Sequence, residues 1–223
     1  MPDMEHVLPF LKKLKKNNNK VWFDTNRSSY EAVKKEAEQL VRDLVDQFGR
    51  TEAAIAQLTP KDCMFRINRD VRFSKDKSPY KTNFGIALTS GGKKSPLAGY
   101  YLHLEPGASF VGGGLWMPQP PVLAAVRQEI DYQFSELQSI LGSAAFRKQY
   151  TALYTGDDVS LTRVPKGYDA DNPAAEYLRL KSFLAMHPLD DGVVGSSTLA
   201  KTAVKAFVAL KPVVDFLNRA QEN

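Results

Sequence analysis

Cationic and aromatic side chains alternate along residues 65–84, and their types suit the recognition of an anion. Between Lys61 and Lys81 the chain carries seven lysine or arginine residues and three aspartates, a local excess of four positive charges. A guanidinium can match a phosphate or carboxylate with two hydrogen bonds, and a neighbouring aromatic ring can stack on the ligand. We therefore predict an anion-binding site formed by Arg66, Arg69, Arg72, Lys77, Tyr80, Lys81 and Asn83.

The same block of residues also permits a purely structural interpretation. Its arginines can pair with Asp62, Asp70, Asp76 or Glu105 and hold down a long connection between two strands. A network of such pairs can order a loop even where each surface pair contributes only about 0–1 kcal/mol. In the first interpretation a guanidinium faces a concave surface, and in the second it faces a carboxylate or a backbone carbonyl.

A glycine segment is a second candidate for the same site. Gly113 and Gly114 precede a helix that we expect to begin near Pro120 or Pro121. Glycines let a backbone approach a ligand closely, and the start of a helix favours anions. A bulged strand end explains the glycines equally well. No G-x-G-x-x-G or G-K-[ST] pattern is present at these glycines, so we predict no nucleotide cofactor.

An aromatic pair flanking an amide is the third candidate. Trp22, Asn26 and Tyr30 are spaced four residues apart and would share one face of a helix. Such a face can line a pocket, or it can simply pack on a sheet. We place the predicted anion site where residues 66–83 meet the glycines and this helix.

Catalytic candidates are few. His103 and Glu105 would share one face of a strand with Tyr101, and a carboxylate can orient an imidazole that acts as a general base. Tyr80 is a further candidate for proton transfer, although a histidine paired in this way can also be structural. No H-x-H or H-E-x-x-H spacing supports a metal site. Cys63, the one cysteine, is interpreted as a packing residue.

The order of the periodic segments predicts one α+β domain over residues 1–223, with a mainly antiparallel sheet of four or more strands covered by helices from both chain ends. Alternating patterns predict strands at residues 63–68, 84–89, 99–105 and 109–111, with a further one at 183–186. Helical spacing predicts a long helix ending at Gly49 and broken near Asn26, another along residues 123–141, and a last one along residues 197–218.

Composition and net charge limit the expected cellular location of the protein and its expected binding partners. A net charge of +5 is modest for 223 residues, so we expect at most weak, non-specific binding of nucleic acid. No apolar run approaches the roughly 20 residues that span a bilayer, and the first residues lack the pattern of a secretion signal. We therefore expect a soluble, cytoplasmic protein without membrane partners. The sequence favours no oligomeric state.

Four blocks of sequence in a fixed order resemble one known family. They are NNNKVWFDTNRSSYE, FRINRDVRFSKDKSPYKTNFG, FVGGGLWMPQPPVLAAVRQEID and VPKGYDADNPAAEYLRLKSF. The chain resembles, over about residues 8–188, the conserved hypothetical proteins grouped as domain of unknown function 2461. The resemblance implies relatives but no reaction, and the site residues above come from their own chemistry.

Three hypotheses for function follow from these patterns. The first is a binding protein for an anionic ligand that carries a phosphate or carboxylate. The second is an enzyme that acts on a phosphorylated or carboxylated small molecule, with the arginines holding the substrate. The third is a structural or interaction protein without a ligand.

Overall fold

The computed structural model describes residues 4–222, which divide into two compact units. The first unit contains residues 4–95, 101–111 and 188–205, and the second contains residues 96–100, 112–187 and 206–222. The expectation of a single domain stays a prediction. No helix among residues 4–222 combines the length and apolar character that crossing a membrane requires.

The strands form one four-stranded antiparallel sheet, which confirms the α+β class. Their order is β1-β2-β3-β4, and their bounds are Phe84–Leu88, Gly99–Leu104, Phe110–Leu115 and Phe183–Pro188. A tight turn joins β2 to β3, with Gly107 at a φ of 73°. Along β2 the side chains of Tyr100, Leu102 and Leu104 are buried, and the alternate side chains are half-buried.

The predicted strand at residues 63–68 is wrong. Residues Pro60–Cys63 form a short helix, α4, because Pro60 suits the first helical position and Thr59 forms a capping box with Asp62. Beyond this helix only isolated antiparallel bridges remain, between Met64 and Ile86 and further along the chain. The fourth strand of the sheet is β4, at the weakest of the predicted strand positions.

The N-terminal helices of the first unit follow the predicted pattern. They are α1 (Val7–Lys16), α2 (Lys20–Thr25) and α3 (Arg27–Phe48), followed by a 3-10 turn, η1 (Ala53–Ile55). Asn26 separates α2 from α3, which confirms the expected break, and its side chain donates to the Trp22 carbonyl at 2.9 Å. Asn19 caps α2 by accepting a hydrogen bond from the Trp22 N–H at 2.9 Å. α3 ends before Gly49, as predicted.

The helices of the second unit are α5 (Pro120–Tyr132), α6 (Phe134–Gly142), α7 (Ala144–Tyr150), α8 (Ala175–Leu178) and most of α10 (Leu199–Arg219). The single helix predicted along residues 123–141 is wrong, because the chain breaks at Gln133 into α5 and α6. Arg219 of α10 binds Glu129 of α5 and Glu136 of α6 at 2.8 and 2.7 Å. A short helix, α9 (Asp191–Val194), belongs to the first unit.

The glycines of β3 lie against the backbones of neighbouring strands. A Cβ on Gly112 would lie 2.1 Å from the Ala185 carbonyl oxygen, and one on Gly114 would lie 1.9 Å from that of Phe183. Gly113 and Gly114 also have φ values of 154° and 121°, which side-chain-bearing residues rarely adopt. The glycines thus allow the close approach of backbone that this part of the sheet requires.

Replacing Gly114 by alanine should therefore be strongly destabilising. Backbone strain alone costs on the order of 1–3 kcal/mol, and the overlap with a carbonyl oxygen adds to it. Gly142→Ala is the matched control, since a Cβ there meets nothing within 4 Å and alanine favours a helix by roughly 0.5–1 kcal/mol. Urea unfolding should show a large decrease in the free energy of unfolding for Gly114→Ala and no decrease for Gly142→Ala. Equal effects would contradict this account of β3.

Candidate functional site

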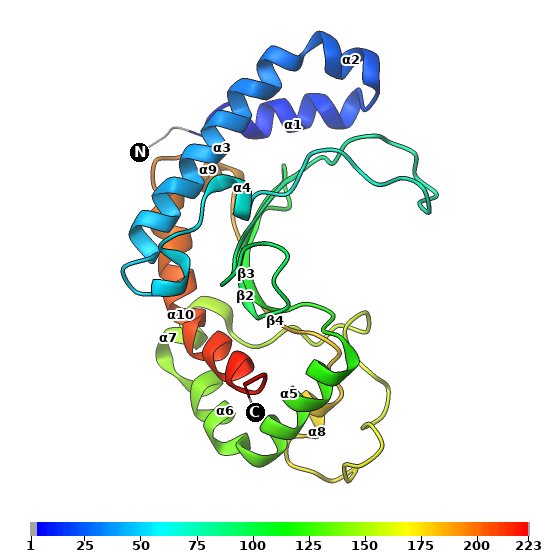
Figure 1. Ribbon diagram of the computed structural model, residues 1–223, viewed down its shortest axis with the longest axis vertical. Helices are drawn as coiled ribbons and strands as arrows, with labels where there is room; N and C mark the ends of the chain where they lie inside the picture. Colours follow the sequence, from blue (N-terminus) through cyan, green and yellow to red (C-terminus); the bar gives the residue numbers. More distant parts are fainter. Residues whose placement is uncertain (1–3, 223) are drawn as a thin grey trace. The chain divides into compact units, whose positions relative to one another are not determined.

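Residues 66–83 form an arm, a long hairpin-like excursion between α4 and β1 (Figure 1). Its outgoing and returning segments are held together by the isolated bridge between Asn68 and Tyr80 and by the hydrogen bond from the Lys81 N–H to the Ile67 carbonyl at 2.8 Å. The side chain of Asn18 accepts from the Tyr80 N–H at 3.1 Å and donates to its carbonyl at 2.8 Å. The Asn17–Asn19 turn therefore anchors the base of the arm.

Arg69 has the structural role that the second interpretation predicted. Its guanidinium binds the Asp76 carboxylate and donates to the Ser78 carbonyl at 3.2 Å and the Ser74 hydroxyl at 3.3 Å. The side chain is only 25% exposed. These contacts close the two halves of the arm on each other, so Arg69 has its hydrogen bonds satisfied inside the protein.

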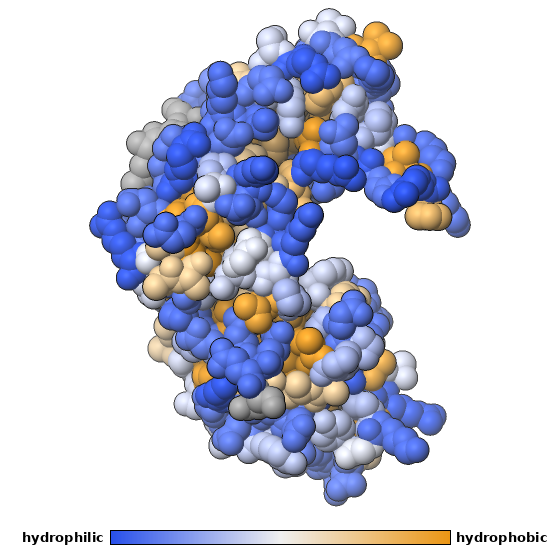
Figure 2. Space-filling view, viewed as in Figure 1, coloured by the Kyte–Doolittle hydropathy of each residue, from blue (hydrophilic) through white to orange (hydrophobic). Residues whose placement is uncertain are grey.

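The outer part of the arm carries exposed charge and one exposed ring. Arg72 donates to both carboxylate oxygens of Asp70, at 2.9 and 2.7 Å, and Lys77 donates to the Val71 carbonyl at 3.0 Å. Phe73 is 94% exposed. Figure 2 shows this segment as a mainly hydrophilic surface with a small apolar patch. Because the Arg72 pair is exposed to water, it contributes little to stability.

Three cations of the arm, Arg66, Lys75 and Lys81, make no hydrogen bond or ion pair through their side chains with any residue in the described range 4–222. Of these three, Arg66 and Lys81 lie at the base of the arm. Burial, and then the positive charge of Arg66, lowers the pKa of Lys81. Lys81 Nζ lies 5.4 Å from the centre of the Phe65 ring. Two cations thus lie near each other at the base of the arm without a protein carboxylate between them.

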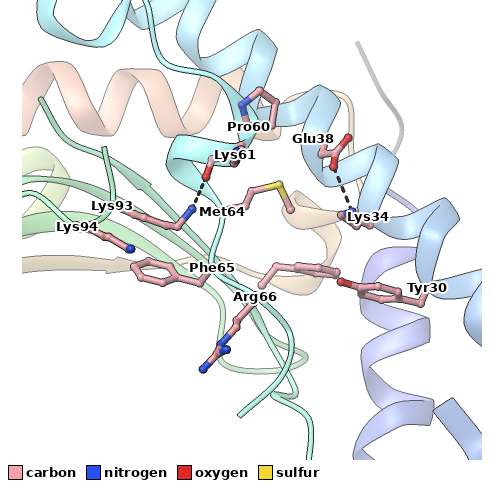
Figure 3. A pocket seen from close by; sticks show the side chains of 11 residues that line it. Tyr30, Lys34, Glu38, Pro60, Lys61, Met64, Phe65, Arg66, Lys93 and Lys94 are labelled. Carbon is pink, nitrogen blue, oxygen red and sulfur yellow. Dashed lines mark hydrogen bonds and ion pairs between the residues drawn. The ribbon is translucent and has the colours of Figure 1, made fainter. Parts of the chain in front are cut away.

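A pocket of about 750 Å³ opens beside Arg66 in the first unit (Figure 3). Its walls come from α3, from α4 and the residues after it, from the start of β1 and from the turn after β1. The lining residues are Tyr30, Lys34, Glu38, Pro60, Lys61, Met64, Phe65, Arg66, Phe84, Lys93 and Lys94. Figure 3 shows Arg66 with no bond to another of these side chains.

The charge of the pocket is strongly positive. Its lining includes five cationic side chains and, among the residues that the structure describes, a single carboxylate, that of Glu38. The Lys34 ammonium lies 3.7 Å from the Glu38 carboxylate and 3.9 Å from the Glu31 carboxylate. Glu38 and Glu31 therefore offset the charge of Lys34. Arg66 and the three remaining lysines form no ion pair among the described residues, and only the longer-range attraction of Asp70 for Arg66 and of Asp62 for Lys61 and Lys93 acts on them.

Lys93 and Lys94 were missed by the sequence interpretation. The turn that carries them depends on Gly91 and Gly92, whose φ values are 81° and 83°. The Lys93 N–H donates to the Asp62 carbonyl at 2.8 Å, and the Lys93 ammonium donates to the Lys61 carbonyl. The signal that could have found this turn is Gly-Gly-Lys-Lys directly after the predicted strand at 84–89.

The helix face of Trp22, Asn26 and Tyr30 contributes one residue to the pocket. Trp22 and Tyr30 both pack on Phe10, with ring centres 6.0 and 6.1 Å away, and Asn26 bonds within its own helix. Tyr30 continues to the pocket wall, where it stacks with Phe84 at 6.5 Å. Among these three residues, Tyr30 is the one that the structure brings to the pocket.

Tyr80 and Asn83 lie on the returning segment of the arm. The Tyr80 ring is 6% exposed and stacks on Phe23 with ring centres 3.9 Å apart, so it forms part of the core. Asn83 is half-buried directly before β1. Gly113 and Gly114 belong to the second unit and contact strand backbones there.

The predicted row of side chains on β2 is present and is hydrogen-bonded. The Tyr101 hydroxyl lies 3.3 Å from His103 Nδ1, and His103 Nε2 lies 3.1 Å from Glu105 Oε2. Thr82 donates to Glu105 at 3.1 Å, and the His103 ring stacks on Phe110 at 4.9 Å. Burial raises the pKa of Tyr101. An imidazole held between a phenol and a carboxylate can transfer a proton between them.

Metal-ligating groups and the cysteine offer no second centre in the part of the chain that the structure describes. Within residues 4–222 no group of three or more histidine, cysteine, aspartate or glutamate side chains could hold a metal ion. Cys63 is buried, and this burial raises the pKa of its thiol to about 11. At neutral pH the thiol is protonated and therefore unreactive.

Comparison with known proteins establishes the family. The model of the conserved hypothetical protein family DUF2461 matches residues 6–216, so the chain belongs to this family. No curated protein and no solved structure matches it.

The contacts of Asp76 lead to a pH prediction for the arm. Hydrogen bonds from the Ser78 hydroxyl and N–H, then from Arg69, lower the pKa of Asp76 to about 2. Since this value lies below the ordinary one of about 3.9, the contacts stabilise the arm fully above about pH 4 and are lost as the pH falls toward 2. The Ser78 amide resonance should titrate near pH 2 and lose this step in Asp76→Asn. A midpoint near the ordinary value would contradict the contacts.

Proposed function

We propose that this protein is a soluble, cytoplasmic binding protein for a small organic anion bearing a phosphate or carboxylate. The ligand occupies the pocket beside Arg66. One observation carries the proposal: several cations line this pocket, and one of them, Arg66, makes no hydrogen bond or ion pair among the described residues.

Electrostatics support an anion in this position. Like charges gathered on one concave surface repel one another, and a bound anion relieves that repulsion while gaining charge-assisted hydrogen bonds. Lys81 adds to the effect, because a nearby Arg66 charge and burial both disfavour its charged form. An anion bound close to both Arg66 and Lys81 would raise the pKa of Lys81 and so oppose the lowering caused by Arg66.

The walls of the pocket support an organic ligand rather than an inorganic ion. Tyr30, Met64, Phe65 and Phe84 line it together with the cations, and a volume of about 750 Å³ lies within the usual range of small-molecule sites. Apolar walls stabilise a complex only if the ligand has apolar surface to bury against them. A ligand with a phosphate or carboxylate on a carbon skeleton could bind the cations through its charged group and the apolar walls through its skeleton.

Arg66→Gln should weaken anion binding without destabilising the fold. Arg66 is exposed and forms no ion pair, so its loss removes repulsion between cations and breaks no hydrogen bond within the protein. Losing a charge-assisted hydrogen bond to the ligand should weaken binding by roughly 1.5–3 kcal/mol. The measurement is calorimetric titration with inorganic phosphate, phosphoglycerate and adenosine monophosphate, with glycerol and adenosine as uncharged controls.

Arg72→Gln is the matched control for this experiment. Arg72 lies on the same arm, is 75% exposed and pairs with Asp70, so its removal should leave affinity unchanged. Equal weakening in the two variants would indicate a general effect of net charge and would contradict a site at Arg66. No binding of any of the three anions to the wild-type protein would reject the proposal.

An enzyme acting on a phosphorylated or carboxylated small molecule is the second candidate. It is favoured by the hydrogen-bonded row of Tyr101, His103 and Glu105, whose histidine is only 15% exposed. Phe65 links the two features, because it lines the pocket and its ring lies edge-on to Tyr101 with centres 6.4 Å apart. In this alternative the His103 imidazole would transfer a proton during the reaction.

The enzyme alternative predicts turnover that depends on His103. Phenyl phosphate incubated with the protein should release phenol and phosphate, followed by NMR, and His103→Gln should slow the release by about 100-fold or more. His6→Gln serves as the control, since His6 is exposed and pairs with Glu36 instead. Binding without turnover would favour the binding protein.

A further inference from the structure

Phe65 is an aromatic side chain that is not buried in the core. It is 36% exposed and lines the pocket, whereas its neighbours Cys63 and Ile67 are 0% and 3% exposed. Nearby rings such as Tyr80 and Phe84 are buried. Because α4 ends at Cys63, the strand that would have placed Phe65 on the same face as these neighbours does not form.

The Phe65 ring is held in one orientation by its surroundings. Its backbone N–H donates to the Gly85 carbonyl at 3.1 Å, and its ring meets the edge of Tyr101 at 61°. Gly85 makes this possible, since a Cβ there would lie 2.4 Å from the Tyr101 hydroxyl and 3.3 Å from the Phe65 ring. Lys81 Nζ lies over the ring at 5.4 Å. A ring fixed in this way loses little conformational freedom when a ligand binds.

Five cationic side chains line the same pocket as this ring. Arg66 follows it in sequence, and Lys93 and Lys94 approach from the turn after β1 (Figure 3). No other ring among residues 4–222 stacks on Phe65, and Tyr101 meets it edge-on. A planar group can therefore lie on Phe65 while an attached phosphate reaches Arg66.

We propose that the ligand of this pocket is a nucleoside phosphate or a similar aromatic phosphate, with its planar ring stacked on Phe65 and its phosphate bound by Arg66 and the lysines. This inference rests on the proposed function and names its ligand class. An aliphatic anion would satisfy the cations but leave the exposed ring of Phe65 without a stacking partner. Stacking on an aromatic side chain tolerates different bases, so the site recognises the presence of a ring rather than its identity.

The experiment compares two ligands that differ only in the base. Adenosine monophosphate should bind the wild-type protein about tenfold more tightly than ribose phosphate, because base stacking contributes on this order. Calorimetric titration gives both dissociation constants. In Phe65→Leu the two ligands should bind equally, since leucine keeps an apolar wall but offers no ring, and in Phe65→Trp the preference should return.

Phe73→Leu is the matched control. Phe73 is also an exposed ring beside an arginine, with Arg72 at 5.7 Å, but it does not line the pocket. The preference for adenosine monophosphate should be unchanged in this variant. Thermal unfolding of each variant establishes that it is folded, and the comparison of the two ligands on the wild-type protein does not depend on any variant.

The outcomes separate this inference from the proposed function. Equal binding of adenosine monophosphate and ribose phosphate by the wild-type protein would overturn the aromatic ligand class and leave the anion site in place. A preference that survives in Phe65→Leu would place the base elsewhere and also overturn the inference. Binding of neither ligand would overturn it too, and the proposed function would then depend on inorganic phosphate and phosphoglycerate. Oligothymidylate binding more tightly than thymidine monophosphate would assign the site to a polymer instead.

Discussion

The antiparallel pairing at the base of the arm determines where its cationic side chains lie. Backbone hydrogen bonds from Phe65 to Gly85 and from Lys81 to Ile67 place the two ends of the arm beside β1. At this point Ile67 is buried, whereas Arg66 is exposed and reaches the pocket. Without this pairing the cations would be spread along a loop.

The charges of the arm divide into two groups with different physical roles. Arg69 binds Asp76 and two further groups, and so closes the arm on itself. Arg66 has no such partner, which leaves its donors available.

Much of the fold was predictable, because local patterns carry it. The break at Asn26 and the end of α3 before Gly49 follow from local capping and turn chemistry. The strand at 63–68 was wrong because a capping box at Thr59 outweighed the alternation of apolar residues. The break at Gln133 was missed because α5 and α6 share one apolar periodicity.

The sequence by itself determined which residues have the right chemistry: a dense cationic and aromatic block in a family whose model covers nearly the whole chain. It could not assign roles within that block, since Arg66 and Arg69 have the same side chain and differ only in what lies opposite. Tertiary structure decided this by bringing Asp76 to Arg69, and by bringing Lys93 and Lys94 to Arg66. Charge pairing depends on distances in space, and spacing along a chain does not fix those distances.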